Sequence, residues 1–199
     1  RQHLLLHSTL RRLAAAAQAA LEVTPRARGG VVAVPTESVW GLSCDANNEM
    51  SVRRLLSIKS RPESKGLILI TDKIERLKSI LGPFPRKTHL IIESSSVNHP
   101  ITCLVPHNGK LSKVILGENE KVAVRVIKHP PARALCAHFG GLLVSTSANP
   151  NGQPAARTEA KVMKYFLNAI DFVSPGSVGG ADNVSEIIDV ASGNVVRAR

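Results

Sequence analysis

Four polar stretches of the sequence could carry chemistry, because each lies beside a run of apolar residues. They are PTESVWG at 35–41, KSRPESKG at 59–66, AVRVIKHP at 123–130 and STSAN at 145–149. Polar groups at the ends of buried strands are where α/β domains build binding sites. The stretch at 59–66 places three cations within seven residues. It therefore favours an anionic ligand, with a solvated basic loop as the alternative.

The STSAN stretch offers three hydroxyls, an amide and backbone N–H groups directly after an apolar run. Such a loop can cradle phosphate oxygens, although a polar turn with local side-chain bonds has the same composition. Neither the GxxxxGK[ST] nor the GxGxxG nucleotide motif occurs. Glu37 of PTES is a candidate general base, and a solvent-facing or capping role is the alternative for it.

Composition narrows the kinds of partner. The formal net charge is +11 and the pI is about 10.1, which favours nucleic acid, nucleotide phosphates or a membrane surface. Aromatic residues make up only 3%, which argues against a base-stacking platform. Three separated cysteines, without a CxxC pair, favour a reducing compartment and no zinc site. The seven scattered histidines are interpreted as surface residues, so no metal site is predicted.

The pattern of apolar residues, caps and breakers predicts one α/β domain over 1–199 with mixed strand directions. Expected strands lie at 31–34, 67–71, 90–92, 101–105, 121–127, 142–145, near 172, and at 186–190 and 195–197. Expected helices lie at about 9–22, 49–60, 74–81, 130–140 and 158–168, with a polar loop at 109–120. The strand at 67–71 is continuously apolar, so it is expected to be central.

The basic N-terminus has the composition of a transit peptide, but its apolar residues fall on one helical face. A first helix packed on the domain is the preferred interpretation, and residues 1–9 are a candidate disordered end. No apolar run approaches the roughly 20 residues of a membrane helix. A cytoplasmic protein without membrane attachment is expected.

Taken in order, the four stretches, followed by SEIIDV and a terminal VVRAR, resemble the YrdC-type threonylcarbamoyl-AMP synthases. The resemblance covers about residues 10–199 and is to the short, single-domain bacterial form. It implies a twisted mixed sheet flanked by helices, with a basic concave face. The activity it implies is synthesis of threonylcarbamoyl-adenylate from L-threonine, bicarbonate (or CO2) and ATP, with release of pyrophosphate.

The resemblance also implies a role in tRNA modification. The product would supply N6-threonylcarbamoylation of adenosine 37 in tRNAs that read ANN codons, completed by a separate transferase complex. The basic face is a candidate surface for direct tRNA contact. Mg²⁺ would accompany ATP and be held mainly by phosphates and water, so an absent metal-ligand cluster is no objection.

Residue roles are carried over from the matching motifs. Lys59 and Arg61 are expected to carry the catalysis by holding the phosphates or the substrate carboxylate. The residues assigned to the threonine pocket are Thr36, Thr102, Arg61 and Arg125. The residues assigned to ATP are Lys59, Lys65, Ser145, Ser147, Asn149, Ser185 and Arg197.

One stretch departs from the family pattern. The family usually has WPGP before the proline-threonine strand, whereas residues 97–100 here read VNHP. This departure puts the shape of the threonine pocket in question. Two other hypotheses remain: a non-catalytic basic module that binds RNA, and carbamoyl-adenylate chemistry as in hydrogenase maturation proteins. The second is disfavoured because the zinc-finger-like cysteines of those proteins are missing.

Overall fold

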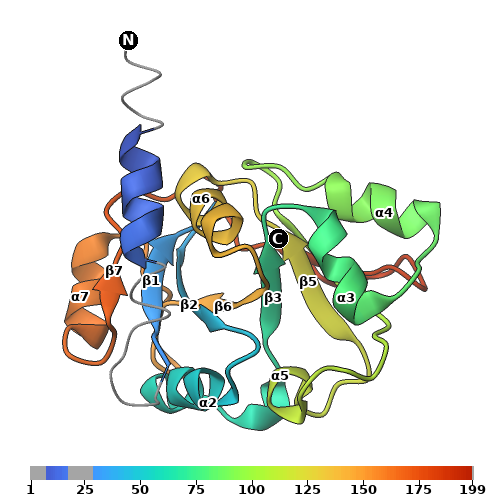
Figure 1. Cartoon of the computed structure of the whole chain (residues 1–199), viewed down its shortest axis with the longest axis horizontal. Coiled ribbons are helices and arrows are strands. Elements are labelled where there is room, and N and C mark those ends of the chain that lie inside the picture. Colours follow the sequence, from blue (N-terminus) through green and yellow to red (C-terminus); the bar gives the residue numbers. More distant parts are fainter. Residues whose placement is uncertain (1–7, 18–28, 199) are drawn as a thin grey trace.

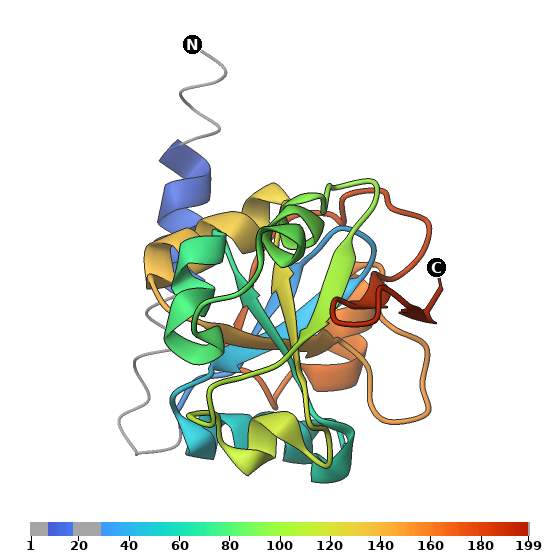
Figure 2. The ribbon, with the colours of Figure 1, turned by 90° about the vertical axis from the view of Figure 1, so that its right-hand side faces the viewer.

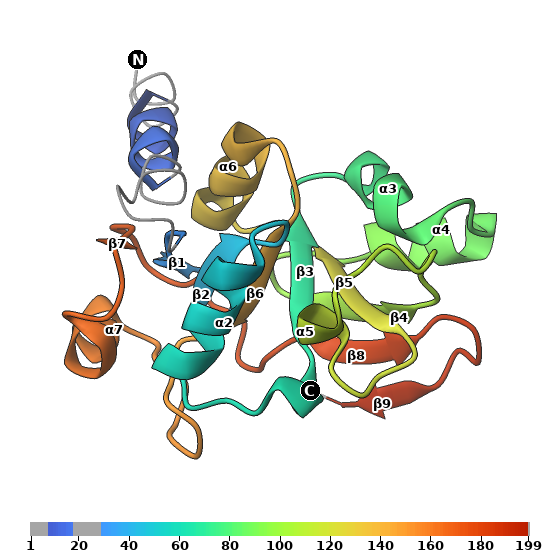
Figure 3. The ribbon, with the colours of Figure 1, turned by 60° about the horizontal axis from the view of Figure 1, so that its bottom comes forward.

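A computed structural model of the chain describes residues 8–17 and 29–198. Within them, the strands form one mixed sheet in the order β7-β1-β2-β6-β3-β5-β4-β8-β9 (Figures 1 and 3). The pairs β1–β7, β3–β5 and β4–β8 are parallel, and the other neighbours are antiparallel. The strands are β1 (Val32–Pro35), β2 (Trp40–Asp45), β3 (Ile68–Thr71), β4 (Ile101–Val105), β5 (Val122–Val126), β6 (Leu143–Ser147), β7 (Phe172–Val173), β8 (Glu186–Asp189) and β9 (Val195–Arg197).

Helices flank this sheet. They are α2 (Glu49–Ile58), α3 (Lys78–Leu81), α4 (Arg86–Glu93), α5 (Lys113–Leu116), α6 (Pro130–Phe139) and α7 (Glu159–Phe166), with 3₁₀ turns at Glu63–Lys65 and Ile74–Leu77. In Figure 1, α6 and α4 lie along the upper border of the sheet, α3 lies to the right of β3, and α2 and α5 lie along the lower border. In Figure 2, β8 and β9 (dark red) stand on the side away from α3 and α6. The predicted mixed α/β class is confirmed.

Local sequence explains the helix ends that border the site. The Asn48 side chain accepts a hydrogen bond from the Ser51 N–H at 3.1 Å and so caps α2. Helix α6 starts at Pro130 and ends before Gly140, whose φ of 77° is in the left-handed region that glycine tolerates. Both helices were predicted. Strand β3 lies in the middle of the sheet, as its apolar run indicated, and Leu69 is fully buried.

Two strand predictions were wrong. The segment at 90–92 belongs to α4 and is not a strand. Leu90 is 58% exposed while Ile92 is 2% exposed, which fits the one-sided burial of a helix, and Pro85 immediately precedes its first turn. Strand β2 was not predicted. Its sequence WGLSCD puts a glycine and a serine between larger residues, and the strand is buried on both faces, so no polar alternation marks it.

One loop prediction also needs correction. The polar stretch at 109–120 contains the short helix α5, which is capped by Ser112 and buries Val114 and Ile115. Just before the 3₁₀ turn at Ile74–Leu77, the Asp72 carboxylate accepts a hydrogen bond from Nε of Arg76 at 2.6 Å, and Lys73 occupies the cap position of that turn without a side-chain bond.

The described part of the first helix covers residues 8–17, where Ala14 and Ala17 are buried. The rest of the predicted helix, 18–22, and most of the candidate disordered end, 1–7, lie outside the described residues. No helix in the described ranges is both long enough and apolar enough to cross a bilayer. Cys44, Cys103 and Cys136 are buried free thiols, as core residues would be.

Candidate functional site

A polar cavity opens where β2, β6, β3 and β5 meet the C-terminal strands. The residues that line it are Thr36, Ser38, Val39, Trp40, Gly41, Arg61, Leu67, Ile68, Ile70, Arg125, Ser145, Thr146, Ser147, Val184, Ser185 and Arg197. Strand register brings several of them together. Gly41 of β2 pairs with Ser147 of β6, and Ile70 of β3 pairs with Arg125 of β5. All four polar stretches thereby contribute residues to one cavity.

The PTES turn joins β1 to β2 and forms one wall. The Thr36 hydroxyl donates a hydrogen bond to the carbonyl of Val39 at 2.7 Å, which closes the turn. At Gly41, an added Cβ would lie 3.0 Å from Oγ of Ser145 and 3.4 Å from Cγ2 of Thr36. A side chain at this position would therefore take up space inside the cavity.

Arg61 follows α2 and reaches the cavity from the KSRP segment. One guanidinium nitrogen, Nη2, donates to the carbonyl of Gly66 at 2.9 Å, while Nε is buried and has no hydrogen-bond partner among the described residues. Burial lowers the pKa of Arg61, but a guanidinium remains charged. Its charge has a main-chain carbonyl beside it and forms no ion pair with a carboxylate of residues 8–17 or 29–198.

Lys59 lies behind the cavity lining. It is 3% exposed, and its ammonium donates to the carbonyls of Ser147 and, at 2.5 Å, Asn149. Its own carbonyl accepts a hydrogen bond from the N–H of Asn151 at 2.8 Å. Burial, together with repulsion from Arg61, lowers the pKa of Lys59 to about 7. Lys59 thus fixes the loop that follows β6, which we call the 147–151 loop.

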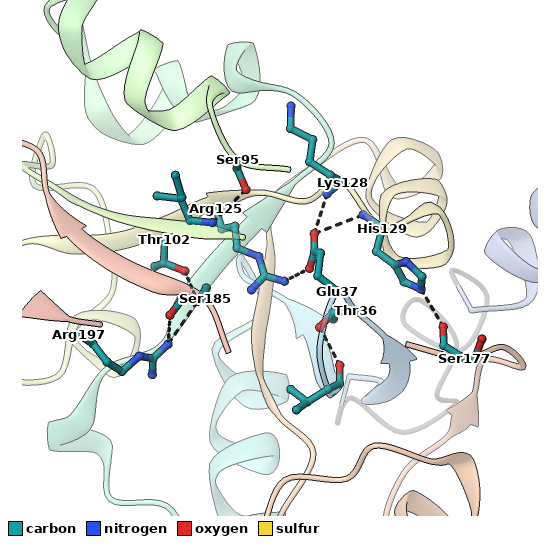
Figure 4. A network of polar contacts seen from close by, with 12 residues as sticks. Thr36, Glu37, Ser95, Thr102, Arg125, Lys128, His129, Ser177, Ser185 and Arg197 are labelled. Carbon is teal, nitrogen blue, oxygen red and sulfur yellow. Dashed lines mark hydrogen bonds and ion pairs between the residues drawn. The ribbon is translucent and has the colours of Figure 1, made fainter. Parts of the chain in front are cut away.

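Arg125 lies on β5 and is paired with a carboxylate. Its Nη2 donates to Oε2 of Glu37, which is fully buried. Oε1 of Glu37 accepts hydrogen bonds from the backbone N–H of Lys128 at 2.8 Å and of His129 at 3.3 Å (Figure 4). The solvent-facing interpretation of Glu37 was therefore wrong, and its carboxylate binds the two backbone N–H groups that directly precede α6.

The C-terminal strands close another side of the cavity. Arg197 donates to the carbonyl of Ser185 at 2.7 Å and to its hydroxyl at 3.3 Å, and the same hydroxyl lies 2.8 Å from that of Thr102 (Figure 4). Burial lowers the pKa of Arg197, and repulsion from Arg125 lowers it further. The two arginines therefore lie close enough to repel each other.

The structure brings most of the predicted residues together but not all of them. Those that line the cavity are Thr36, Arg61, Arg125, Ser145, Ser147, Ser185 and Arg197. Lys59, Lys65, Thr102 and Asn149 lie outside its lining. Lys65 is exposed, with Nζ 3.4 Å from the Asn151 side chain, and Thr102 is fully buried under Ser185. The Asn149 side chain accepts the Ser147 hydroxyl at 2.6 Å, which makes it part of the loop's own bonding.

Sequence reasoning missed several lining residues. Trp40, Gly41 and Val184 were not singled out, because β2 was not predicted and Val184 lies in a loop without a motif. Nothing in the local pattern marks Gly41. The interpretation of all histidines as surface residues was wrong for His129, which is 8% exposed and whose Nε2 lies 2.8 Å from the carbonyl of Ser177.

The VNHP segment forms a turn just before β4. His99 and Ser96 exchange backbone and side-chain hydrogen bonds, and Nε2 of His99 lies 3.1 Å from a carboxylate oxygen of Glu186. The carbonyl of Pro100 accepts a hydrogen bond from the N–H of Glu186 at 3.0 Å. The departure from the family pattern thus lies next to the Thr102–Ser185 contact, one layer behind the cavity.

The mixed sheet and its cavity, which is lined by three arginines, are those of an α/β domain with a cavity suited to anionic ligands. A family model, Sua5_yciO_yrdC, described as "Telomere recombination", matches residues 26–199, and the chain belongs to this family. The chain is 51% identical over 170 residues to the threonylcarbamoyl-AMP synthase of Pseudomonas savastanoi pv. phaseolicola, covering 85% of this chain and 91% of that protein. It is 49% identical over 180 residues to the enzyme of the same name from Pseudomonas fluorescens, covering 90% and 95%.

Solved structures have the same fold. P. abyssi Sua5 complexed with L-threonine aligns with a TM-score of 0.78 and 26% identity, covering 90% of this chain and 50% of that chain. E. coli YciO aligns with a TM-score of 0.74 and 20% identity, covering 90% and 84%. The resemblance read from the sequence is confirmed.

Proposed function

We propose that this protein is a threonylcarbamoyl-AMP synthase, which makes L-threonylcarbamoyl-adenylate from L-threonine, bicarbonate (or CO2) and ATP and releases pyrophosphate. The proposal rests on the family and on relatives of that name over most of their length. One observation in the structure carries it: the cavity gathers three arginines, and no aspartate or glutamate is among the described residues that line it.

An anionic ligand is the partner that this arrangement lacks. Arg197 is repelled by Arg125. Nε of Arg61 and Nε of Arg125 are both buried without a hydrogen-bond partner among the described residues. Buried unsatisfied donors and uncompensated charges are unfavourable, and a bound oxyanion relieves both. ATP and a substrate carboxylate are ligands of this kind.

We assign the polyphosphate to the side of the cavity formed by Arg61, Arg197 and the end of β6. Ser145 and Ser147 of β6 line the cavity, and Lys59 fixes the 147–151 loop that follows them. Polar turns of this kind bind phosphate oxygens through hydroxyls and backbone N–H groups. Lys59 then affects phosphate binding indirectly, by holding the 147–151 loop in place. Lys65 adds positive charge at the rim of the cavity.

We assign the threonine to the side formed by Arg125 and the PTES turn. A guanidinium can bind a carboxylate through two parallel hydrogen bonds, which fixes its orientation. Arg125 is held in place by a buried carboxylate, so its direction is set before the substrate arrives. Thr102 acts from behind, by holding the hydroxyl of Ser185.

The reaction needs positioning and charge stabilisation more than acid–base groups. The threonine amine adds to CO2 to give a carbamate, and a carbamate oxygen attacks the α-phosphorus of ATP. The bond from that phosphorus to the bridging oxygen breaks, and pyrophosphate leaves. Negative charge grows on the α-phosphate oxygens and on pyrophosphate, and Arg61 and Arg197 lie where they can stabilise it.

ATP would enter as its Mg²⁺ complex, in which the ion neutralises phosphate charge. No group of three or more His, Cys, Asp or Glu that could hold a metal occurs within residues 8–17 and 29–198. The side chains at the cavity are hydrogen-bond donors, which suits a metal carried by the phosphates and water rather than by the protein.

Pyrophosphate release from Mg-ATP, with threonine and bicarbonate omitted in turn, tests the proposal. Release that requires both substrates is expected. Release without threonine, or none from the folded protein in the full mixture, would refute it. The RNA-binding alternative predicts salt-dependent RNA binding with no dependence on threonine, and the named relatives favour the enzyme.

The product would pass to a separate tRNA threonylcarbamoyl transferase complex for modification of adenosine 37. A cytoplasmic location fits this role, and direct contact with tRNA through the basic surface is part of the same proposal. Footprinting of a transcript that carries an ANN-reading anticodon, at several salt concentrations, would detect such contact. Protection that is the same for unrelated RNA would argue against a specific role.

A further inference from the structure

We propose that Glu37 is a positioning residue that fixes Arg125 for recognition of the substrate carboxylate, and that it is not the general base. The inference deepens the proposed function and rests on it. Glu37 lies in the turn between β1 and β2, and Arg125 lies on β5, so the ion pair joins this turn to a strand that is a neighbour of neither β1 nor β2 in the sheet.

The surroundings of Glu37 argue against a role as base. A general base needs a free oxygen within hydrogen-bond reach of the substrate proton. Glu37 is fully buried and does not line the cavity, and both of its oxygens already accept hydrogen bonds. Figure 4 shows its carboxylate pointing between Arg125 and the two residues before α6, Lys128 and His129. The group that faces the substrate is the arginine.

The same turn also fixes the segment that closes the cavity. The carbonyl of Thr36 accepts a hydrogen bond from the N–H of Gly179 at 2.9 Å, and the carbonyl of Glu37 accepts one from the N–H of Ala181 at 2.9 Å. This segment leads to Val184 and Ser185 in the cavity wall. The main chain of Glu37 thus holds one wall while its side chain orients a guanidinium in another.

Charge distinguishes this arginine from the others in the cavity. Arg125 is paired with a buried carboxylate, whereas Arg61 and Arg197 donate to main-chain carbonyls. A paired arginine adds little net charge to the cavity, but its direction is fixed. Directional recognition of one carboxylate needs a fixed donor, whereas a polyphosphate mainly needs net positive charge. Loss of Glu37 should therefore weaken threonine binding and spare ATP binding.

The test measures binding of L-threonine and of ATP separately by titration calorimetry, on the full chain. Glu37→Gln keeps an oxygen acceptor for the Lys128 N–H but removes the charge opposite Arg125. We expect the Kd for threonine to rise about tenfold, since breaking one side of a buried charge pair is costly, and the Kd for ATP to change less than about twofold. An equal loss for both ligands, or an unchanged threonine Kd, would overturn the inference.

A matched control is Asp171→Asn. Asp171 also pairs with an arginine, Arg54, and accepts a backbone N–H, from Val31 at 2.7 Å, but it lies outside the cavity lining. It should leave both affinities unchanged. Absence of threonine binding by the unaltered protein would overturn the proposed function and this inference with it. Normal binding that Glu37→Gln does not disturb would overturn this inference alone.

A double variant keeps the test valid if Glu37→Gln does not fold. Arg125→Met with Glu37→Gln removes both charges, which is less destabilising than leaving one charge unpaired in the interior. If Glu37 acts through Arg125, the double variant should bind threonine as weakly as Arg125→Met and no more weakly. A further loss in the double variant would mean that Glu37 contributes by another route and would overturn the inference.

Discussion

The two buried cations on either side of the cavity, Lys59 and Arg125, are held by different kinds of partner. Lys59 donates to main-chain carbonyls of the 147–151 loop, and Arg125 donates to the carboxylate of Glu37. Carbonyl partners leave the positive charge in the site, whereas a carboxylate cancels it. The first side therefore offers charge for phosphates, and the second offers a fixed direction for a small anion.

The difference also explains how each cation tolerates burial. Removing a charged group from water is costly unless it is paired. Arg125 meets a full opposite charge, whereas Lys59 meets neutral carbonyl and amide oxygens and the nearby positive charge of Arg61, and its pKa falls to about 7. Without a ligand, the phosphate side thus carries positive charge that no carboxylate among the described residues compensates. On the threonine side, the charge of Arg125 is already compensated and its side chain is already oriented.

The largest effect is expected from Arg61→Ala, which removes one of the two arginines, Arg61 and Arg197, that line the phosphate side. Threonine-dependent pyrophosphate release should fall by about 100-fold or more, because charge that develops on the phosphates loses one of its two guanidinium partners. Steady-state rates at saturating ATP measure this. An unchanged rate would end the assignment of that side to phosphates.

Lys59→Met should weaken ATP binding indirectly, because Lys59 holds the 147–151 loop and does not line the cavity. Loss of the loop contacts is expected to raise the Kd for ATP about tenfold and to leave that for threonine within about twofold. Calorimetry on the folded variant checks both values, with Lys164→Ala, a change at an exposed lysine outside the cavity lining, as the control. If Lys59→Met raised the Kd for threonine as much as the Kd for ATP, the assignment of the two ligands to different sides of the cavity would be wrong.

The pH dependence of stability sharpens the account of Lys59. Its pKa falls from 10.5 in the unfolded chain to about 7 in the folded one, so the unfolded state binds more protons between those values. Stability should therefore rise with pH across that window, by at most about 1.4 kcal/mol per pH unit. The free energy of unfolding, measured in urea from about pH 7 to 9.5, should rise more for the wild type than for Lys59→Met. Parallel curves would mean that the carbonyl bonds keep Lys59 protonated.

Thr102→Val tests the layer behind the cavity. The fully buried Thr102 would lose its contact with the Ser185 hydroxyl, and the expected cost is about 1–2 kcal/mol of unfolding free energy. Because Ser185 retains its bond to Arg197, binding of both substrates should change less than about threefold. Denaturant unfolding and calorimetry decide this. A large loss of threonine affinity at normal stability would place Thr102 in direct contact with the substrate.

His99→Ala should have the smallest effect. The side chain of His99 is 42% exposed and its contact with Glu186 is a surface pair, which is worth about 1 kcal/mol or less. Pyrophosphate release should change less than about twofold. A strong loss would show that the VNHP turn shapes the threonine pocket.

The sequence by itself determined most of the elements and the chemical character of the site. A continuous apolar run placed β3 in the middle of the sheet, and the proline and glycine around α6 marked its ends, because these are local preferences of backbone and solvation. The four polar stretches predicted an anion site from their residue types alone.

Only the tertiary structure decided which cations face the cavity and what holds each of them. The sequence could not place Lys59 behind the 147–151 loop or Glu37 beside Arg125, since these pairs lie 88 or more residues apart and depend on strand register. Nor could it reveal β2, whose two faces are both buried. Burial and pairing depend on how the chain packs. The sequence alone therefore does not distinguish a charged residue that faces solvent from one that faces a ligand or a buried partner.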